Sequence, residues 1–391
     1  MRSITLAAIL VATAFTGTSN AQPAATPACE PGGPAVQEVS VGGQPFIAVA
    51  GADGCTVFAS LESGRSGGVA VLKYGTGGWS KTSEMSLSRP AFGMALTNDG
   101  AILAVAEGDG VTFLDTARLT AGSGGAELGH IDDGGRGAIY VAVTPDDRLL
   151  FVSDERSQSI SVIDLVKARA SNFATDALIG RIGAGNAPVG LAFSADGRAL
   201  FATAEVMPWP DRSKVCQAES AKQKGEHFEG ALLQIDVDQA RSDPSHALIG
   251  GVPAGCNPVR VALSPSGDRV YVTARDSNAL LVFDTGKSKP AGTLLAAIAV
   301  GTSPVGVVAA GNQVIVTNSN RFGSDRSEPQ TLTVIDAAKI GVDADPTLGS
   351  VEVGAFPRNL TVTADGKILL VANATSQSVT LIRLADMPIK R

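Results

Sequence analysis

The chain has 391 residues, a net charge of −7 and 18% charged residues, and it contains 45 glycines. The negative charge argues against a general nucleic-acid binder, because such proteins present basic surfaces to phosphate groups. The composition also excludes a coiled coil or a disordered chain, and it suits many short strands joined by tight turns.

The first 21 residues are predicted to be a secretory signal peptide. Met1-Arg2-Ser3 precede an apolar run that extends to Phe15, and small polar residues follow up to Ala21. This layout is typical of a cleaved signal, and the apolar run is too short to span a bilayer. We therefore expect an exported protein, periplasmic or extracellular, with no membrane span. Residues 22–35 are expected to form an N-terminal extension.

A unit of three short strands recurs seven times. In the clearest copy, from Asn257 to Asp284, strands are predicted at 259–263, 269–273 and 279–283. The units begin at intervals of 46, 47, 50, 70, 46 and 53 residues, at Pro45, Ala91, Ala138, Pro188, Pro258, Pro304 and Pro357. A period near 46 residues, with a fourth strand after the third, is typical of a propeller blade. We expect an all-β fold, a seven-bladed β-propeller of four-stranded blades over residues 36–384, followed by a tail at 385–391.

Ring closure is predicted from the two ends of the repeat region. The strand at 36–42 has no blade before it, and the last unit ends at Leu384 without a fourth strand. The N-terminal strand is therefore expected to complete the C-terminal blade, because this pairing removes the open edges.

Two features recur at fixed places in the units. Asp-Gly turns join first and second strands, as at Asp53-Gly54 and Asp365-Gly366, and glycine supplies the positive φ that a tight hairpin needs. An aspartate follows the third strand in five units, at Asp115, Asp164, Asp236, Asp284 and Asp336. Its regular position favours a structural role, accepting backbone N–H bonds where the chain turns.

The unit resembles the YVTN-type β-propeller repeat of the YncE-like secreted propellers, over residues 36–384. The resemblance rests on the pattern Pro-x-Gly/Arg-Val-x-x-Ser-Pro-x-Gly and on Val270-Tyr271-Val272-Thr273-Ala274. It implies a seven-bladed propeller. The family repeat ends in Thr-Asn, whereas several units here end in Thr-Ala, Ala-Glu or Ser-Asp, so the resemblance implies the fold more strongly than any loop function.

Two insertions lie between second and third strands, at 206–230 in the fourth blade and at 319–330 in the sixth. Both loops belong to the face of the ring that holds the channel mouth, and long loops in compact domains are often functional. We expect the first insertion to form a lid over the mouth.

The four cysteines are predicted to form two disulfides, as suits an exported chain. Cys216 lies in the 206–230 insertion and Cys256 in an adjacent loop on the same face, so we expect them to be bonded. A Cys29–Cys55 bond is expected to staple the ring closure. The cysteines show no CxxC spacing, so neither a zinc site nor covalent haem is predicted.

Charged and amide side chains gather at the predicted mouth. One arc is acidic, with Glu107, Asp154, Glu155 and Glu205, and the facing arc contains Arg275, Asn318 and Asn373. First strands and loops between blades add Arg136, Tyr140, Arg260, Arg358 and Asn359. Such a cluster suits a small anionic or zwitterionic ligand or a protein partner. The alternative is that these residues are solvated or paired with one another.

Two functions compete. The first is a binding or scaffold propeller without catalysis, a reading that the resemblance and the lack of a nucleophile motif favour. The second is a lactonase or lactonising enzyme, a chemistry that other seven-bladed propellers carry. Its acid–base and oxyanion-stabilising candidates are Glu205, His227, Arg260, Arg275 and Arg358. An accessory subunit of a periplasmic redox enzyme is a third hypothesis. No metal or cofactor is predicted.

Overall fold

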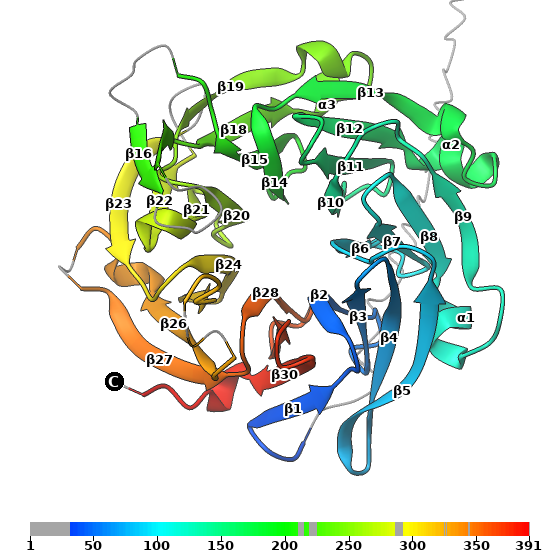
Figure 1. Cartoon of the computed structure of the whole chain (residues 1–391), viewed down its shortest axis with the longest axis horizontal. Coiled ribbons are helices and arrows are strands. Elements are labelled where there is room, and N and C mark those ends of the chain that lie inside the picture. Colours follow the sequence, from blue (N-terminus) through cyan, green and yellow to red (C-terminus); the bar gives the residue numbers. More distant parts are fainter. Residues whose placement is uncertain are drawn as a thin grey trace, which may run out of the picture.

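The computed structural model describes residues 32–209, 215–218, 225–285, 292–323, 325, 327–342 and 345–390. Seven antiparallel sheets of four strands form a ring around a central channel (Figure 1). The predicted seven-bladed β-propeller is therefore confirmed. The predicted signal peptide lies outside the described residues. In the part that is described, no helix is long and apolar enough to cross a membrane.

Each blade runs from an inner strand at the channel to an outer strand at the rim (Figure 1). The first four blades are β2 (Gln44–Ala50), β3 (Thr56–Ser63), β4 (Ser66–Gly75) and β5 (Gly78–Leu87); β6 (Met94–Leu96), β7 (Ile102–Ala106), β8 (Val111–Asp115) and β9 (Glu127–Ile131); β10 (Ala138–Val143), β11 (Leu149–Asp154), β12 (Ser159–Asp164) and β13 (Leu178–Gly183); and β14 (Asn186–Phe193), β15 (Ala199–Val206), β18 (Ala231–Asp236) and β19 (Leu248–Pro253). The last three are β20 (Pro258–Leu263), β21 (Arg269–Ala274), β22 (Ala279–Asp284) and β23 (Thr293–Ala299); β24 (Pro304–Ala310), β25 (Gln313–Asn318), β26 (Gln330–Asp336) and β27 (Thr347–Val353); and β28 (Pro357–Val362), β29 (Ile368–Asn373), β30 (Ser378–Arg383) and β1 (Val36–Ser40).

The remaining elements are short and lie between strands. A separate hairpin, β16 (Val215–Ala218) with β17 (Gly225–Phe228), stands inside the fourth blade's insertion. The helices are α1 (Thr116–Ala121), α2 (Leu165–Ala170) and α3 (Val237–Ala240), with 3-10 turns η1 (Thr175–Ala177), η2 (Pro244–His246), η3 (Arg275–Ser277), η4 (Ala337–Lys339) and η5 (Leu384–Asp386).

The ring closes as the sequence predicts. Strand β1 pairs antiparallel with β30, with Val36 opposite Ile382 and Ser40 opposite Ser378. The last blade thus has the order β1-β30-β29-β28, and its outer strand comes from the other end of the chain (Figure 1). Both termini of the repeat region are therefore held in a single sheet, which leaves no gap between the first and last blades.

The middle strands are apolar because both of their faces are buried. All six residues of β11 are buried, and the side chains of Phe151 and Val162 in the third blade pack with those of Leu200 and Leu233 in the fourth. Side chains from one face of a sheet thus meet those from the next sheet. This burial explains why the middle strands read as continuous apolar runs rather than as alternating patterns.

The recurring aspartate is the last residue of the third strand, and it caps the turn that follows. Asp115, Asp164 and Asp236 each accept a backbone N–H three residues later, at 2.9, 2.9 and 3.0 Å, at the start of α1, α2 and α3. Asp336 accepts the N–H of Ala338 at 3.0 Å. The structural interpretation of the repeat is confirmed at these four positions.

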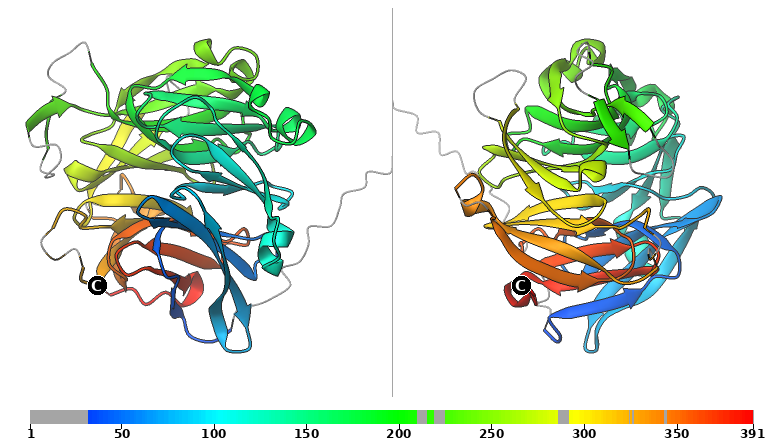
Figure 2. Two further views of the ribbon diagram at one scale, coloured as in Figure 1. Left: turned by 45° about the vertical axis from the view of Figure 1, so that its right-hand side comes forward. Right: turned by 60° about the vertical axis from the view of Figure 1, so that its left-hand side comes forward.

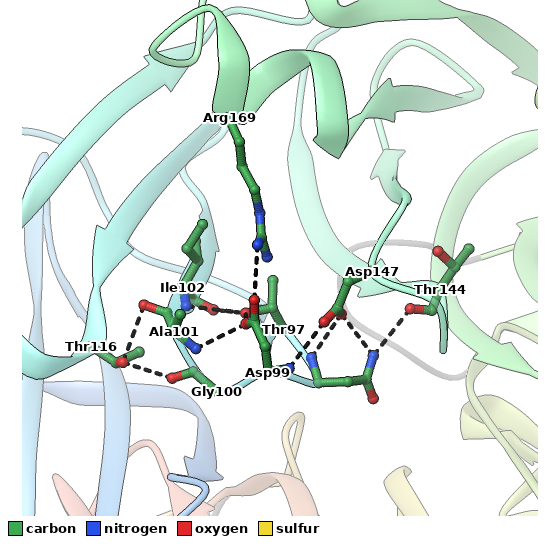
Figure 3. A network of polar contacts seen from close by, with 10 residues as sticks. Thr97, Asp99, Gly100, Ala101, Ile102, Thr116, Thr144, Asp147 and Arg169 are labelled. Carbon is green, nitrogen blue, oxygen red and sulfur yellow. Dashed lines mark hydrogen bonds and ion pairs between the residues drawn. The ribbon is translucent and has the colours of Figure 1, made fainter. Parts of the chain in front are cut away.

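The Asp-Gly turns lie on the face opposite the mouth, with φ of 66° at Gly54 and 70° at Gly366. In the third blade the glycine is replaced by Asp147, which adopts φ of 54°. Its carboxylate accepts the backbone N–H of Asn98 at 2.7 Å and that of Asp99 at 3.0 Å (Figure 3). The departure from glycine thus ties the second and third blades together.

Candidate anion site at the channel mouth

The second strands end at the mouth, where the first strands begin, and their last side chains alternate in direction. Positions are counted here from the first residue of the second strand. In four blades the sixth residue turns into its own blade and bonds hydroxyl groups of the third strand. They are Glu107 (with Thr112, 2.7 Å), Asp154 (with Ser161, 2.6 Å), Asn318 (with Thr331 and Thr333, 2.9 Å each) and Asn373 (with Ser378, 3.2 Å, and Thr380, 2.8 Å). The structure does not bring these four predicted ligand-binding residues to the channel.

The seventh residues point the other way. Glu155, Glu205 and Arg275 line one cavity at the mouth. Glu62 occupies the same strand position in the first blade and contacts Arg358, which lines the cavity as well. The strand alternation therefore separates the residues that reach the channel from those that stabilise a blade.

The inner strands contribute through a bulge near their first residue. The pairing register shifts just after Pro258, and equivalent shifts occur in five other blades. A bulge re-aims the side chains that follow it. Here Val259 reaches the cavity, and the N–H of Arg260 donates to Thr273 Oγ1 at 3.0 Å. The same hydroxyl donates to the carbonyl of Val305 at 2.7 Å, which links two neighbouring inner strands.

The cavity has a volume of about 90 Å³. Apolar side chains from four blades meet at its base, where Val189, Val259 and Val305 form a buried cluster and Ile139 packs against them. The walls carry four arginines, two carboxylates and two aromatic rings: Arg260, Arg275, Arg321, Arg358, Glu155, Glu205, Phe46 and Phe356. The site is therefore a small, strongly charged recess over an apolar base.

Two of the arginines are held by carboxylates. Arg275 donates from both terminal nitrogens to Glu205, at 3.0 and 3.2 Å, and its Nε lies 3.6 Å from Asp276. Arg358 donates to Glu62 at 2.8 Å. Both oxygens of Glu205 are thus occupied, which places this predicted catalytic carboxylate in a structural ion pair.

Arg260 is a buried cation that forms no ion pair with a carboxylate in the described part of the chain. It is 4% exposed, and its guanidinium carbon lies 4.6 Å from the ring centre of Tyr140 and 5.3 Å from that of Phe46. Its Nε has no hydrogen-bond partner, and Nη1 donates only a long bond of 3.4 Å to Val259 O. Burial lowers the pKa of Arg260 to about 10. The side chain remains protonated at neutral pH, with donor capacity that the protein does not use.

Arg321 and Glu155 form the partly exposed rim of the cavity. Neither has an ion pair with any described residue. Burial, followed by the charges of Arg358 and Arg275, lowers the pKa of Arg321 to about 10. Burial, followed by the charge of Glu205, raises the pKa of Glu155. Among the residues that the structure describes, two cations and one carboxylate thus face the cavity without an ion pair: Arg260, Arg321 and Glu155.

The remaining predicted residues have other roles or are not described. Arg136 is exposed on a loop between blades, and Tyr140 lies against Arg260. Asn359 is buried, with Oδ1 bound to the N–H of Leu360. The side chain of His227 lies outside the part of the chain that is described.

Sequence reasoning missed Glu62, Arg321, Phe46 and Phe356. A strict count along the second strands would have found Glu62, because it shares the seventh position with Glu155, Glu205 and Arg275. Arg321 lies in the predicted 319–330 insertion but in a segment without a repeat pattern. No comparable signal marks the two aromatic rings.

The disulfide between Cys216 and Cys256 is confirmed. It ties the hairpin β16–β17 to the start of the fifth blade. In Figure 1 the hairpin lies toward the outside of the ring, and Figure 2 (left) shows it projecting from the body. The described residues of the 206–230 insertion do not line the cavity, so a lid role stays a prediction. Cys29 lies outside the described residues, and the Cys29–Cys55 bond also stays a prediction.

The described residues contain no group of three or more His, Cys, Asp or Glu side chains placed to hold a metal ion. A close pair of acids lies behind the mouth, where Asp133 and Asp154 are both fully buried. Burial and then the charge of Asp133 raise the pKa of Asp154 to about 8.

No protein-family model matches the chain, and no curated protein matches it. Several solved structures share its fold. A chain of hydrazine synthase from Kuenenia stuttgartiensis is 20% identical with a TM-score of 0.65, covering 88% of this chain and 96% of that one. The periplasmic gluconolactonase of Pseudomonas aeruginosa is 21% identical with a TM-score of 0.59, covering 80% and 86%. A chain of the mitotic checkpoint complex is 15% identical with a TM-score of 0.65, covering 98% and 99%. At these identities the likeness shows the propeller fold alone.

Proposed function

We propose that the protein is an exported propeller that binds a small anion in the recess at its channel mouth. The observation that carries the proposal is the buried guanidinium of Arg260, which has no carboxylate partner among the described residues and an unused Nε donor. Burying a cation costs several kcal/mol unless a counter-charge and hydrogen bonds offset it. Cation–π contacts with the rings of Tyr140 and Phe46 offset about 2 kcal/mol of this cost, the usual value for a desolvated contact. A bound anion would supply the missing partner.

Arg321 supports the same function. It shares the cavity with Arg260 and has no ion pair with a described residue. Two guanidinium groups facing one recess suit a carboxylate, because each presents planar N–H donors at a matching spacing. Export is supported by the predicted signal peptide and by the Cys216–Cys256 disulfide, which is typical of oxidising compartments.

Binding is tested by titration of small anions into the purified protein, followed by calorimetry. We expect the wild type to bind and Arg260→Gln to lose at least about tenfold in affinity, since one charged hydrogen bond contributes about 1.5–3 kcal/mol. Arg136→Gln is the matched control, because Arg136 is exposed and does not line the cavity. Equal affinities of wild type and Arg260→Gln, or no binding of any anion, would reject the proposal.

Lactone hydrolysis is the second candidate, and Glu155 is the observation that favours it. Its raised pKa suits a group that both accepts and donates a proton. Water would attack the lactone carbonyl while Glu155 takes its proton, and Arg260 and Arg321 would stabilise the oxyanion. The ring C–O bond then breaks, and the alkoxide recovers the proton from Glu155. Turnover of lactones that Glu155→Gln abolishes without loss of folding would establish this activity; absence of turnover in the wild type would exclude it.

A further inference from the structure

The charges around the recess constrain the ligand more than the presence of arginine does. Four arginines face four carboxylates in and directly behind the cavity: Arg260, Arg275, Arg321 and Arg358 against Glu62, Glu155, Glu205 and Asp276. The group is therefore neutral when Glu155 is ionised and carries +1 when Glu155 is protonated. An anion that enters alone leaves a net negative charge in a poorly solvated site, which is unfavourable.

Glu155 is the group able to correct that imbalance. Glu62 and Glu205 are fixed in ion pairs with Arg358 and Arg275, and Asp276 accepts a hydrogen bond from Asn257. Glu155 instead lines the cavity without an ion pair to a described residue, close enough to Glu205 to be affected by its charge. Protonation of Glu155 removes that repulsion and supplies an O–H donor beside an incoming anion.

Charges outside this group of eight also act on Glu155. Arg156 next in the chain, Arg321 after β25 and Arg260 on β20 favour its ionised form, whereas Glu205 at the end of β15 opposes it. Behind it, Asp154 and Asp133 form the buried acid pair. A bound anion would neutralise the effect of Arg260 and Arg321. The larger effect of Glu205 would then be opposed by Arg156 alone, which favours the protonated form of Glu155.

We infer that the recess captures a small monocarboxylate together with one proton, which resides on Glu155. The inference rests on the proposed anion binding at Arg260 and Arg321. At a share of about 30 Å³ per water in the liquid, the cavity of about 90 Å³ corresponds to about three waters, which limits the bound part of the ligand to a few heavy atoms. The carboxylate faces the two arginines, and the carbon atoms lie on Val189, Val259 and Val305. Uptake occurs at acidic pH and release at alkaline pH.

Four probes of similar size separate the possible ligand classes. Propionate is a monocarboxylate, propionamide is its neutral analogue, alanine adds an ammonium group, and sulfate is a dianion. We expect propionate to bind most tightly. Its affinity falls by up to about tenfold per pH unit on the alkaline side, since one proton is linked to binding. Calorimetry in two buffers of different ionisation enthalpy counts the protons, and we expect uptake of up to one per propionate.

The Glu155→Gln variant separates proton uptake from anion binding, because glutamine keeps a hydrogen-bond donor and cannot titrate. We expect this variant to bind propionate with a flat pH profile and without proton uptake. Binding of propionate that depends on Arg260 but takes up no proton would overturn the inference and leave anion binding intact. Tighter binding of alanine would assign a zwitterion, and tighter binding of sulfate a dianion, and each would overturn the inference. If no probe binds, the proposed function itself fails.

Discussion

Arg275 and Glu205 come from neighbouring blades and meet at the channel mouth in a two-pronged ion pair, with N–O distances of 3.0 and 3.2 Å. Their side chains are only 6% and 11% exposed. Each is the seventh residue counted from the start of its second strand, so the repeat itself brings the two together. The pair fixes one wall of the recess and takes Glu205 out of the set of free carboxylates.

Removal of one partner of this pair is expected to destabilise the ring. Glu205→Gln leaves the buried Arg275 with Asp276 alone, at 3.6 Å. We expect a loss of about 3 kcal/mol in the free energy of unfolding, at the lower end for a broken buried pair. Urea unfolding measures the loss, and Glu84→Gln is the control because its ion pair with Lys81 is at the surface. A loss below about 1 kcal/mol would show that the pair is not structurally important.

The Cys216–Cys256 bond is expected to stabilise the insertion more than it affects the recess. Replacement of both cysteines by serine should lower the free energy of unfolding by about 2–4 kcal/mol. Anion affinity should stay within about twofold, because the described residues of the insertion do not line the cavity. Thermal unfolding and calorimetry measure the two effects separately. A large loss of affinity at unchanged stability would instead support the predicted lid.

The acid pair behind the mouth is expected to make stability depend on pH. The pKa of Asp154, about 8 in the folded chain, lies above the usual value of a free aspartate near 3.9. The folded state therefore binds more protons than the unfolded state across this range. The contribution of Asp154 to the free energy of unfolding is complete below about pH 4 and is lost as the pH rises through about 8. Asp154→Asn should flatten this decline in urea unfolding between pH 5 and 8. An unchanged slope would contradict it.

On the face of the ring opposite the channel mouth, Asp99 gives stability the reverse dependence on pH. Burial tends to raise the pKa of Asp99, but hydrogen bonds from Arg169, Thr97 and the N–H of Ala101 lower it to about 2 (Figure 3). A lowered pKa contributes stability above about pH 4 that is lost as the pH falls toward 2. Asp99→Asn should therefore reduce the acid sensitivity of thermal unfolding in that range. The Asp196→Asn variant, at the turn of the fourth blade, is the control for a turn without a cross-blade arginine.

The fold was predictable because the same local rules repeat seven times. Turns such as Asp53-Gly54, apolar runs such as Val270-Tyr271-Val272 and the orphan strand at 36–42 each have one simple solution, and these solutions agree with one another. A single copy would have been ambiguous. Seven copies, with five of the six intervals between 46 and 53 residues, together favour a closed ring when the unpaired strand at 36–42 is considered.

The site was only partly predictable. The seventh-position residues Glu155, Glu205 and Arg275 reach the recess, whereas Glu107 and Asp154, one position earlier, turn into their blades. A side-chain period of two decides this difference, and it becomes visible only when strand ends are aligned residue by residue. The position of Arg321 depends on an irregular loop, and the contact of Arg260 with Tyr140 and Phe46 spans three blades, so neither follows from a repeat pattern.

The position of a bound carboxylate in a crystal shows directly whether the recess at Arg260 and Arg321 is the binding site. Crystals soaked with 3-bromopropionate would reveal the bromine by its anomalous scattering. We expect one dominant peak in the recess over Val189, Val259 and Val305, with the carboxylate at Arg260 and Arg321, and no such peak in Arg260→Gln crystals. Bromine found only elsewhere on the surface, or equally in the recess of the variant, would contradict carboxylate binding at Arg260.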